Sequence, residues 1–381
     1  MRPRCVIGCV IAAAMTLLMF GLPTRAQLMI VGNDQKPKID NGSIVMLPPG
    51  HDTLSVVDIS KPTEPRIVAT IPMDNTVAGP PTNLAITPNR DIALVANSLN
   101  AVEKDGKWQT EPDNRLFVVD LKASPPSVLT TLTLGKQPSG LAINATGTIA
   151  LVANRAEGTI SVLSINGKEV KVTDTVTVGA PGDQVSAVAI TPDGRMALAV
   201  KAAVDKVAVL DINGGKATPY NIAVTPDGKL ALIANTGNGG SSDGNVDTVS
   251  VVDLETKPIR IIDHITVGDS PEGLVINPKG DLAVTIEARG SNKSKDTWYY
   301  HPGGAVTALR IEGKRVTPVG EVTVGGLPEA AAFSADGSIL YIGNFLDSDL
   351  SVLRVGGGRL TDTGQRFKLP GQPASMRAGP Q

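Results

Sequence analysis

Two charged residues stand where an asparagine otherwise recurs, and their types suit acid–base chemistry. Apolar segments that end in asparagine repeat along the chain, but one copy ends in Lys201 and another in Glu287. A lysine and a glutamate at equivalent positions could form a proton-transfer or ligand-anchoring pair. The alternative is ordinary drift where the local turn no longer needs an amide side chain.

Histidine and aromatic residues gather in long insertions. The chain has three histidines, of which His51 and His301 lie in insertions, whereas His264 lies on a presumed outer strand. Aromatic residues make up only 3% of the chain, and those in the insertions are Trp108, Trp298, Tyr299 and Tyr300. We expect the insertion around 293–301 to contact a ligand or partner. The alternative is that its aromatic rings hold a long loop against the protein.

Two further acidic residues follow prolines at equivalent steps. Glu272 comes after Pro271, and Glu329 comes after Pro328. Both steps are expected at the same end of the fold as the insertions, so both glutamates are candidate ligand-binding residues. Most acidic residues in loops are simply solvated, and that is the alternative here.

The sequence predicts no metal site and no cofactor. Both cysteines, Cys5 and Cys9, lie near the N-terminus, so the rest of the chain has no thiolate ligand or thiol for haem attachment. Calcium near Asp243 and Asp247 is an alternative, because residues 236–247 are rich in oxygen ligands. That segment lacks EF-hand spacing and also reads as a flexible glycine loop.

The first 26 residues are expected to be a secretory signal peptide. Arg2 and Arg4 precede an apolar run, and Thr24 and Ala26 put small residues before the cleavage point. An uncleaved anchor is the alternative. A periplasmic or secreted protein with one domain over 27–381 follows, with no membrane insertion after cleavage.

The charge balance argues against nucleic acid as a partner. Without Arg2, Arg4 and Arg25, the 35 basic residues fall to 32 against 37 acidic residues. No segment clusters lysine and arginine, as phosphate binding requires. We expect a monomer whose ligand is an unidentified protein, peptide or small molecule.

A repeated unit positions these candidates. One β-branched, apolar pattern recurs seven times with a mean spacing of about 49 residues, at 53–59, 115–121, 159–165, 206–212, 248–254, 305–311 and 349–355. Strands apolar on both faces are covered on both sides. A second strand precedes each copy and ends in the recurrent asparagine, which we expect to cap a turn.

Turns of the Thr-Pro-Asp-Gly type precede the second strands, so each unit reads as four short antiparallel strands. This arithmetic predicts an all-β, seven-bladed β-propeller. The N-terminal unit lacks a first strand and the segment 369–376 reads as one, so one blade is expected to be shared between the termini. The fourth unit is short, and its outer strand near 217–221 is expected to be stunted or missing.

The segments Ala-Leu-Val-Ala-Asn at 93–97 and 150–154 and Ala-Leu-Ile-Ala-Asn at 231–235 resemble the YVTN-type β-propeller repeat. The resemblance covers essentially the whole chain after residue 26 and implies the propeller fold. Relatives of this kind include binding scaffolds, lactone hydrolases and parts of redox systems, so fold alone does not select a function.

The long insertions share one position in the unit, between its second and third strands. They span 34–52, 98–114, 236–247 and 288–304. Insertions on one face of a repeat array mark a binding face. The sequence favours a binding or scaffold protein that uses this face. A lactonase-like hydrolase using His301 or His51 with Glu287, and an accessory protein of a periplasmic redox system, are the alternatives.

Overall fold

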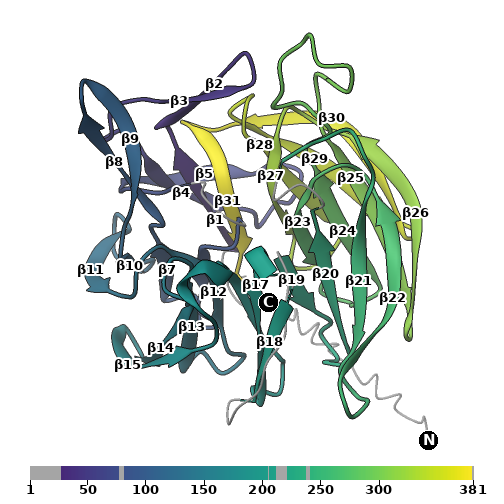
Figure 1. The fold of residues 1–381 in the computed structure, drawn as a ribbon, viewed down its shortest axis with the longest axis horizontal. Coiled ribbons are helices and arrows are strands. Elements are labelled where there is room, and N and C mark those ends of the chain that lie inside the picture. The colour runs from purple at the N-terminus through teal and green to yellow at the C-terminus, as the bar shows by residue number, and fades with distance from the viewer. Residues whose placement is uncertain (1–26, 77–80, 205, 212–220, 237–240, 380–381) are drawn as a thin grey trace, which may run out of the picture.

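The computed structural model describes residues 27–76, 81–204, 206–211, 221–236 and 241–379. The expected signal peptide lies outside these residues. Seven antiparallel sheets surround a central axis, so the predicted seven-bladed, all-β propeller is confirmed (Figure 1). No helix in the described ranges is long and apolar enough to cross a membrane.

Blades one to four run, from the innermost strand outward, β31 (Gln372–Ala378), β1 (Leu28–Asp34), β4 (Thr53–Asp58) and β5 (Arg66–Pro72); β6 (Leu84–Ile86), β7 (Ile92–Ala96), β10 (Arg115–Asp120) and β11 (Ser127–Thr133); β12 (Pro138–Ile143), β13 (Ile149–Asn154), β14 (Thr159–Asn166) and β15 (Glu169–Thr177); β16 (Val185–Ile190), β17 (Met196–Lys201) and β18 (Lys206–Asp211).

Blades five to seven run β19 (Asn221–Val224), β20 (Leu230–Asn235), β21 (Asp247–Asp253) and β22 (Arg260–Val267); β23 (Pro271–Ile276), β24 (Leu282–Glu287), β25 (Ala305–Glu312) and β26 (Arg315–Thr323); β27 (Pro328–Phe333), β28 (Ile339–Asn344), β29 (Asp349–Gly356) and β30 (Arg359–Lys368). Two 3-10 turns, η1 (Pro181–Asp183) and η2 (Ala202–Val204), flank the fourth blade.

The ring closes where the C-terminal strand joins the N-terminal one. β31 pairs with β1 in antiparallel register from Met29 opposite Ala378 to Asp34 opposite Gln372, and the two strands lie side by side in Figure 1. Each innermost strand also packs against the innermost strands of the two neighbouring blades. The shared blade predicted from the two ends is therefore present.

The core consists of apolar layers between adjacent blades. Each of the seven main clusters draws its buried side chains from two neighbouring sheets. Leu94 and Val118 of the second blade, for example, pack with Leu141 and Val152 of the third. This arrangement explains why the third strands of the repeat are apolar on both faces.

The fourth blade has three strands in the described residues. Most of the segment expected to hold its outer strand, 217–220, lies outside the described residues. Asn221, the last residue of that segment, instead begins β19, the innermost strand of the fifth blade.

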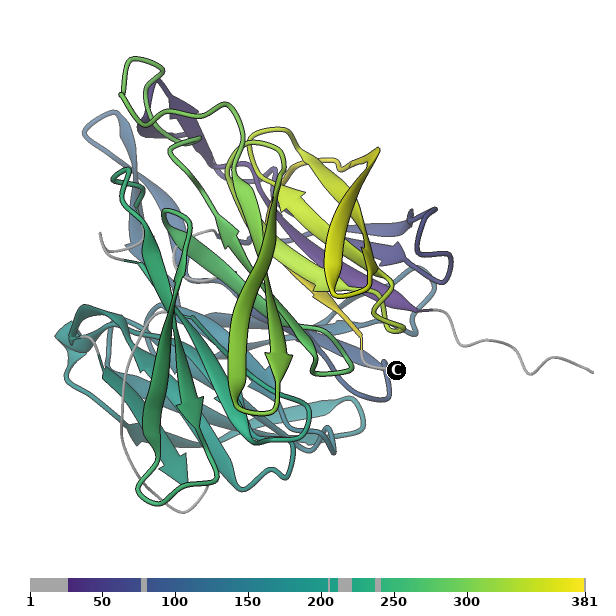
Figure 2. The ribbon, with the colours of Figure 1, turned by 90° about the vertical axis from the view of Figure 1, so that its right-hand side faces the viewer.

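Two insertions contain strands where the sequence indicated only loops. β2 (Pro37–Asp40) pairs with β3 (Ser43–Met46), and β8 (Leu99–Lys104) pairs with β9 (Lys107–Pro112). Both are two-stranded hairpins that project from the ring on the same side as the 288–304 insertion (Figure 2).

The recurrent asparagine fastens strands together, which corrects our expectation that it caps a turn. Asn154 Nδ2 donates to Thr159 Oγ1 and to Ser161 Oγ, each at 2.9 Å. Equivalent pairs of bonds are made by Asn33, Asn235 and Asn344. We call this contact the asparagine clasp; it joins the end of the second strand to the start of the third.

Replacing the clasp asparagine is expected to destabilise the protein. Asn154→Ala leaves the buried hydroxyl of Ser161 without its partner, which should lower the free energy of unfolding by about 1–3 kcal/mol. Urea denaturation measures the change. Asn89→Ala, at an exposed turn, is the control, and an equally stable Asn154→Ala protein would contradict the role assigned to the clasp.

Candidate functional site

Two glutamates of adjacent blades meet at one mouth of the central channel. Glu272 is the second residue of β23 and Glu329 is the second residue of β27. Their exposed fractions are 8% and 5%. Both strands are innermost in their blades and pack against each other. The sequence placed both residues at this mouth, but it gave no indication that they form a pair.

The two carboxyl groups resist ionisation together. Burial raises the pKa of Glu272 to about 7, although the Ser270 hydroxyl and the charge of Lys293 act in the opposite direction. Burial also raises the pKa of Glu329 well above its usual range, and the nearby charge of Glu272 raises it further. Two carboxyl groups that disfavour each other's charge titrate as one unit, with one proton held near neutral pH. Glu329 Oε2 is buried and has no hydrogen-bond partner in the described part of the chain.

The insertions cover this mouth and remove water from the pair. The β2–β3 turn reaches the sixth blade, where Ser294 Oγ donates to Asn41 Oδ1 at 2.8 Å. Lys293 Nζ in turn donates to Ser241 Oγ of the fifth blade's insertion, and β3 packs against β9. We call residues 35–52, 98–114, 241–247 and 288–304, taken together, the collar.

An apolar cluster lies between the collar and the ring. Ile39 of β2 packs on Ala288, Leu327, Phe345 and Ala374, all of which are buried. Leu327 and Ala288 are close in sequence to Glu329 and Glu287, respectively. Low local polarity beside a carboxylate disfavours its charged form, so the collar accounts for the raised pKa values.

Glu287 occupies the position of the clasp asparagine in the sixth blade. Its side chain is fully buried, and it accepts hydrogen bonds from the Thr285 and Thr307 hydroxyls, while Oε2 has no partner. Burial raises the pKa of Glu287 to about 8. The residue therefore retains a clasp-like contact with the third strand, through Thr307, and is also a protonated acid at neutral pH.

Lys201 and Glu287 each find partners within their own blades. Lys201 Nζ lies 2.6 Å from Asp183 Oδ2 of the same blade. That hydrogen bond lowers the pKa of Asp183. The two residues belong to the fourth and sixth blades, and the structure does not bring them together as a pair.

The histidines and aromatic residues of the collar differ in exposure. The side chains of His51 and His301 are exposed, whereas Glu287 is buried. Trp108 lies half-buried on β9, and Tyr300 is half-buried as well. His301 and Glu287 make no common contact in the described residues.

Tyr299 and Trp298 perform different tasks. Tyr299 donates its hydroxyl to the Ser242 carbonyl at 3.2 Å and so fixes the loop to its neighbour. Trp298 is 81% exposed and meets the Tyr299 ring edge to face at 5.2 Å. The loop-anchoring alternative thus describes Tyr299, while Trp298 remains available to a partner.

The aspartates of the 236–247 insertion accept backbone hydrogen bonds. Asp243 accepts from the amide of Asn245, and Asp247 accepts from the amide of Ser270. Asp269 accepts from the amides of Asp243 and Gly244. The described residues contain no group of three or more histidine, cysteine, aspartate or glutamate side chains placed to hold a metal ion. Residues 237–240 of this insertion lie outside the description.

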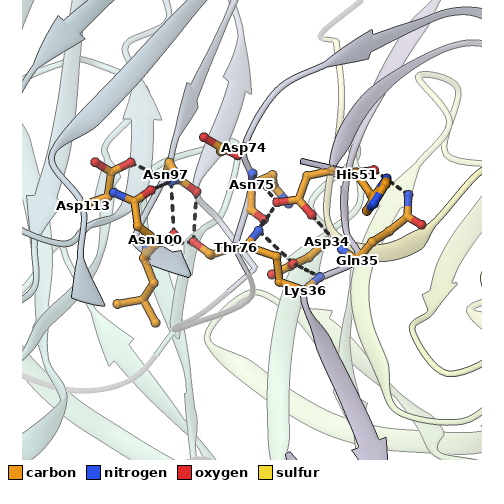
Figure 3. Close-up of polar contacts among 12 residues, drawn as sticks. Asp34, Gln35, Lys36, His51, Asp74, Asn75, Thr76, Asn97, Asn100 and Asp113 are labelled. Atoms are coloured by element: carbon orange, nitrogen blue, oxygen red, sulfur yellow. Dashed lines mark hydrogen bonds and ion pairs between the residues drawn. The ribbon is translucent and has the colours of Figure 1, made fainter. Parts of the chain in front are cut away.

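A buried lysine holds the base of the collar, which the sequence did not indicate. Lys36 is 2% exposed and makes ion pairs with Asp34 and Asp52. Its ammonium also donates to the Asn75 carbonyl at 2.6 Å, and Figure 3 shows these contacts converging on one nitrogen. An ammonium has three donors, and these contacts account for all of them, so Lys36 braces the first insertion.

A pocket of about 300 Å³ lies beside this brace, between the two hairpins. Its lining residues are Lys36, Pro49, Asp74, Leu99, Asn100, Ala101 and Val102. Arg115 closes one side through bonds to Asp74 and Asn100. No short sequence motif marks this site, because its residues come from three separate segments.

The fold and the channel mouth define a seven-bladed propeller with a buried acid pair, and known structures share the fold. The chain superimposes on a periplasmic gluconolactonase of Pseudomonas aeruginosa with a TM-score of 0.67 at 16% identity, covering 93% of this chain and 99% of that one. A Bacteroides fragilis protein provisionally named a 6-phosphogluconolactonase gives 0.67 at 15%, covering 93% and 98%.

A protein of unknown function from Desulfotomaculum acetoxidans gives a TM-score of 0.66 at 14% identity, covering 93% of this chain and 100% of that one. At these identities the likeness concerns the fold alone. No protein-family model and no curated protein matches the chain. Membership of the YVTN repeat family therefore stays a prediction.

The raised pKa of Glu287 has a measurable effect on stability. The unfolded pKa is about 4.3 and the folded pKa is about 8, so between these values the native protein holds the extra proton. The free energy of unfolding should consequently fall as pH rises through this window. Glu287→Gln removes the titration, and we expect it to exceed the wild type by a few kcal/mol at pH 9, at about 1.4 kcal/mol per pKa unit.

Denaturant titrations from pH 5 to pH 9 measure this difference. Glu312→Gln, at an exposed turn of the same blade, is the matched control and should follow the wild-type curve. Parallel curves for wild type and Glu287→Gln would show that Glu287 ionises normally in the folded protein.

Proposed function

We propose that the protein hydrolyses small lactones at the channel mouth, with Glu272 and Glu329 as the catalytic acid–base pair. The observation that carries this proposal is the mutual elevation of two buried carboxyl pKa values at the end of a channel. Groups that are shifted towards neutral pH and enclosed in a cleft are typical of acid–base sites.

The pair supplies both functions that lactone hydrolysis needs. The ionised carboxylate accepts a proton from water, whose oxygen bonds to the lactone carbonyl carbon. The protonated partner donates to the developing oxyanion and returns a proton to the ring oxygen as the ring C–O bond breaks. The product is a hydroxy acid, and the pair regains its single proton. Structural likeness to proteins named gluconolactonases supports this choice of substrate class.

Removing either acid should abolish turnover. Glu272→Gln and Glu329→Gln are each expected to lower kcat/KM for glucono-δ-lactone by about 10²–10⁴-fold. The protein would be taken from the periplasmic fraction, where export predicts a mature chain beginning at Gln27. pH-stat titration measures the acid released, and the loss of the signal peptide is read from the intact mass.

Glu64→Gln, at an exposed turn on the other face of the ring, is the control for the charge change. The wild-type rate should rise through pH 7 as the pair takes up its singly protonated form. Wild-type protein without activity on any lactone, or both glutamine variants at full activity, would rule the proposal out.

Binding of a protein partner through the collar is the second candidate. The observation that favours it is the exposure of apolar side chains there: 81% for Trp298, 66% for Ile44 and 43% for Val45. Exposed apolar residues next to an otherwise polar surface indicate an interaction site. The accessory-redox alternative stays a prediction, because no described residue bears on it.

Trp298→Ala tests this second candidate. Because the indole is largely solvated, the substitution should leave stability within about 0.5 kcal/mol of wild type while removing the anchor. A partner held by immobilised wild-type protein, and by the surface control Val172→Ala, should be lost from Trp298→Ala, as quantitative mass spectrometry would show. Equal retention by all three proteins would contradict a binding role for Trp298.

A further inference from the structure

The innermost strands leave a lumen whose wall is almost uniformly small and apolar at one level. This level is defined by pairing with the third residue of each blade's second strand, for example Ala142 opposite Leu151. The seven residues at this level are Ala85, Ala142, Ala189, Ala223, Val275, Ala332 and Arg377. Six short side chains and one arginine therefore face the same space.

Arg377 has room only towards the lumen. Its strand, β31, is the innermost strand of its blade and is flanked by β27 and β6. The equivalent Ala142 and Ala189 fit only a methyl group beside the neighbouring blade and are half-buried, with their exposed surface on the lumen side. The much longer arginine side chain is also half-buried, so its guanidinium extends into the lumen.

The guanidinium has no counter-ion from the protein. Among the described residues, Arg377 makes neither an ion pair nor a side-chain hydrogen bond, and its burial is not offset by any nearby charge. In all seven strands the residues directly before and after this level are apolar. Arginine stays charged in proteins, so this site holds an uncompensated cation.

The acid pair at the mouth lies three residues further along the strands, about 10 Å away at the usual rise per residue. It is too distant to bond Arg377, and near neutral pH it carries about one negative charge. A lone cation in a confined, poorly polar space attracts an anion more strongly than one in bulk water. A planar, two-oxygen anion suits the fork of donors on a guanidinium.

We propose that the lumen of the propeller is an anion-binding site, with Arg377 as its cationic anchor, for a carboxylate or a phosphate. The ligand enters the lumen, and two of its oxygens accept hydrogen bonds from the guanidinium. The alanines at the same level leave space for the rest of the ligand. This site does not depend on lactone hydrolysis at the mouth.

Isothermal titration calorimetry on the full chain at low ionic strength tests the site, with gluconate and inorganic phosphate as separate probes. The wild type is expected to bind one anion per chain, and Arg377→Gln to bind it at least about tenfold more weakly. Arg359→Gln, an exposed arginine of β30, is the matched control and should bind like the wild type. Preference for gluconate over phosphate would assign the site to organic acids, and the reverse preference to phosphate.

Arg377→Lys provides a second variant that keeps the charge but loses the fork of donors. It should retain weaker binding than the wild type and more than Arg377→Gln, and it serves in place of Arg377→Gln if that variant does not fold. Binding unaffected by either substitution, or a wild type that binds neither probe, would overturn the proposal.

Discussion

The pairing of β31 with β1 is the interaction on which the ring depends. It joins residues about 345 positions apart in the sequence, from Met29 with Ala378 to Asp34 with Gln372. Two of the inter-blade cores include side chains of this shared blade, so neither core is complete until the last strand docks. The same strand carries Arg377 and Ala374, and its docking therefore also completes the wall of the lumen and the apolar cluster under the collar.

The collar makes the two halves of the channel mouth different. Blades three and four receive no long insertion, whereas the fifth, sixth and first blades meet above the mouth through Lys293 and Ser294. Glu272 and Glu329 lie in the covered half. At the same position, the third and fourth blades present Ser139 and Ser186. The acids are thus found where water is scarce, which is the environment in which a carboxyl group keeps its proton.

Repetition made the frame predictable, and departures from repetition did not follow the same rule. The blade count, the shared blade and the face that carries the insertions all follow from spacing and turn chemistry, because a repeated pattern has to fold the same way each time. The clasp was misassigned: a terminal asparagine suggests a turn cap, whereas the bonds of Asn154 cross to the next strand. The brace at Lys36 and the pairing of Glu272 with Glu329 could not be derived, since each joins segments whose proximity only the closed ring creates.

The clasp is confined to a single blade, and this has a consequence for how such a ring can change. Its bonds run between two adjacent strands and do not reach the neighbouring sheets. Losing one clasp thus weakens one blade by about the worth of a buried hydrogen bond, while the other blades keep theirs. A ring of equivalent positions can consequently try a new side chain in one of them at a small and local risk. Lys201 and Glu287 are two such trials in a single chain: the first formed an ion pair with Asp183, and the second became a buried acid.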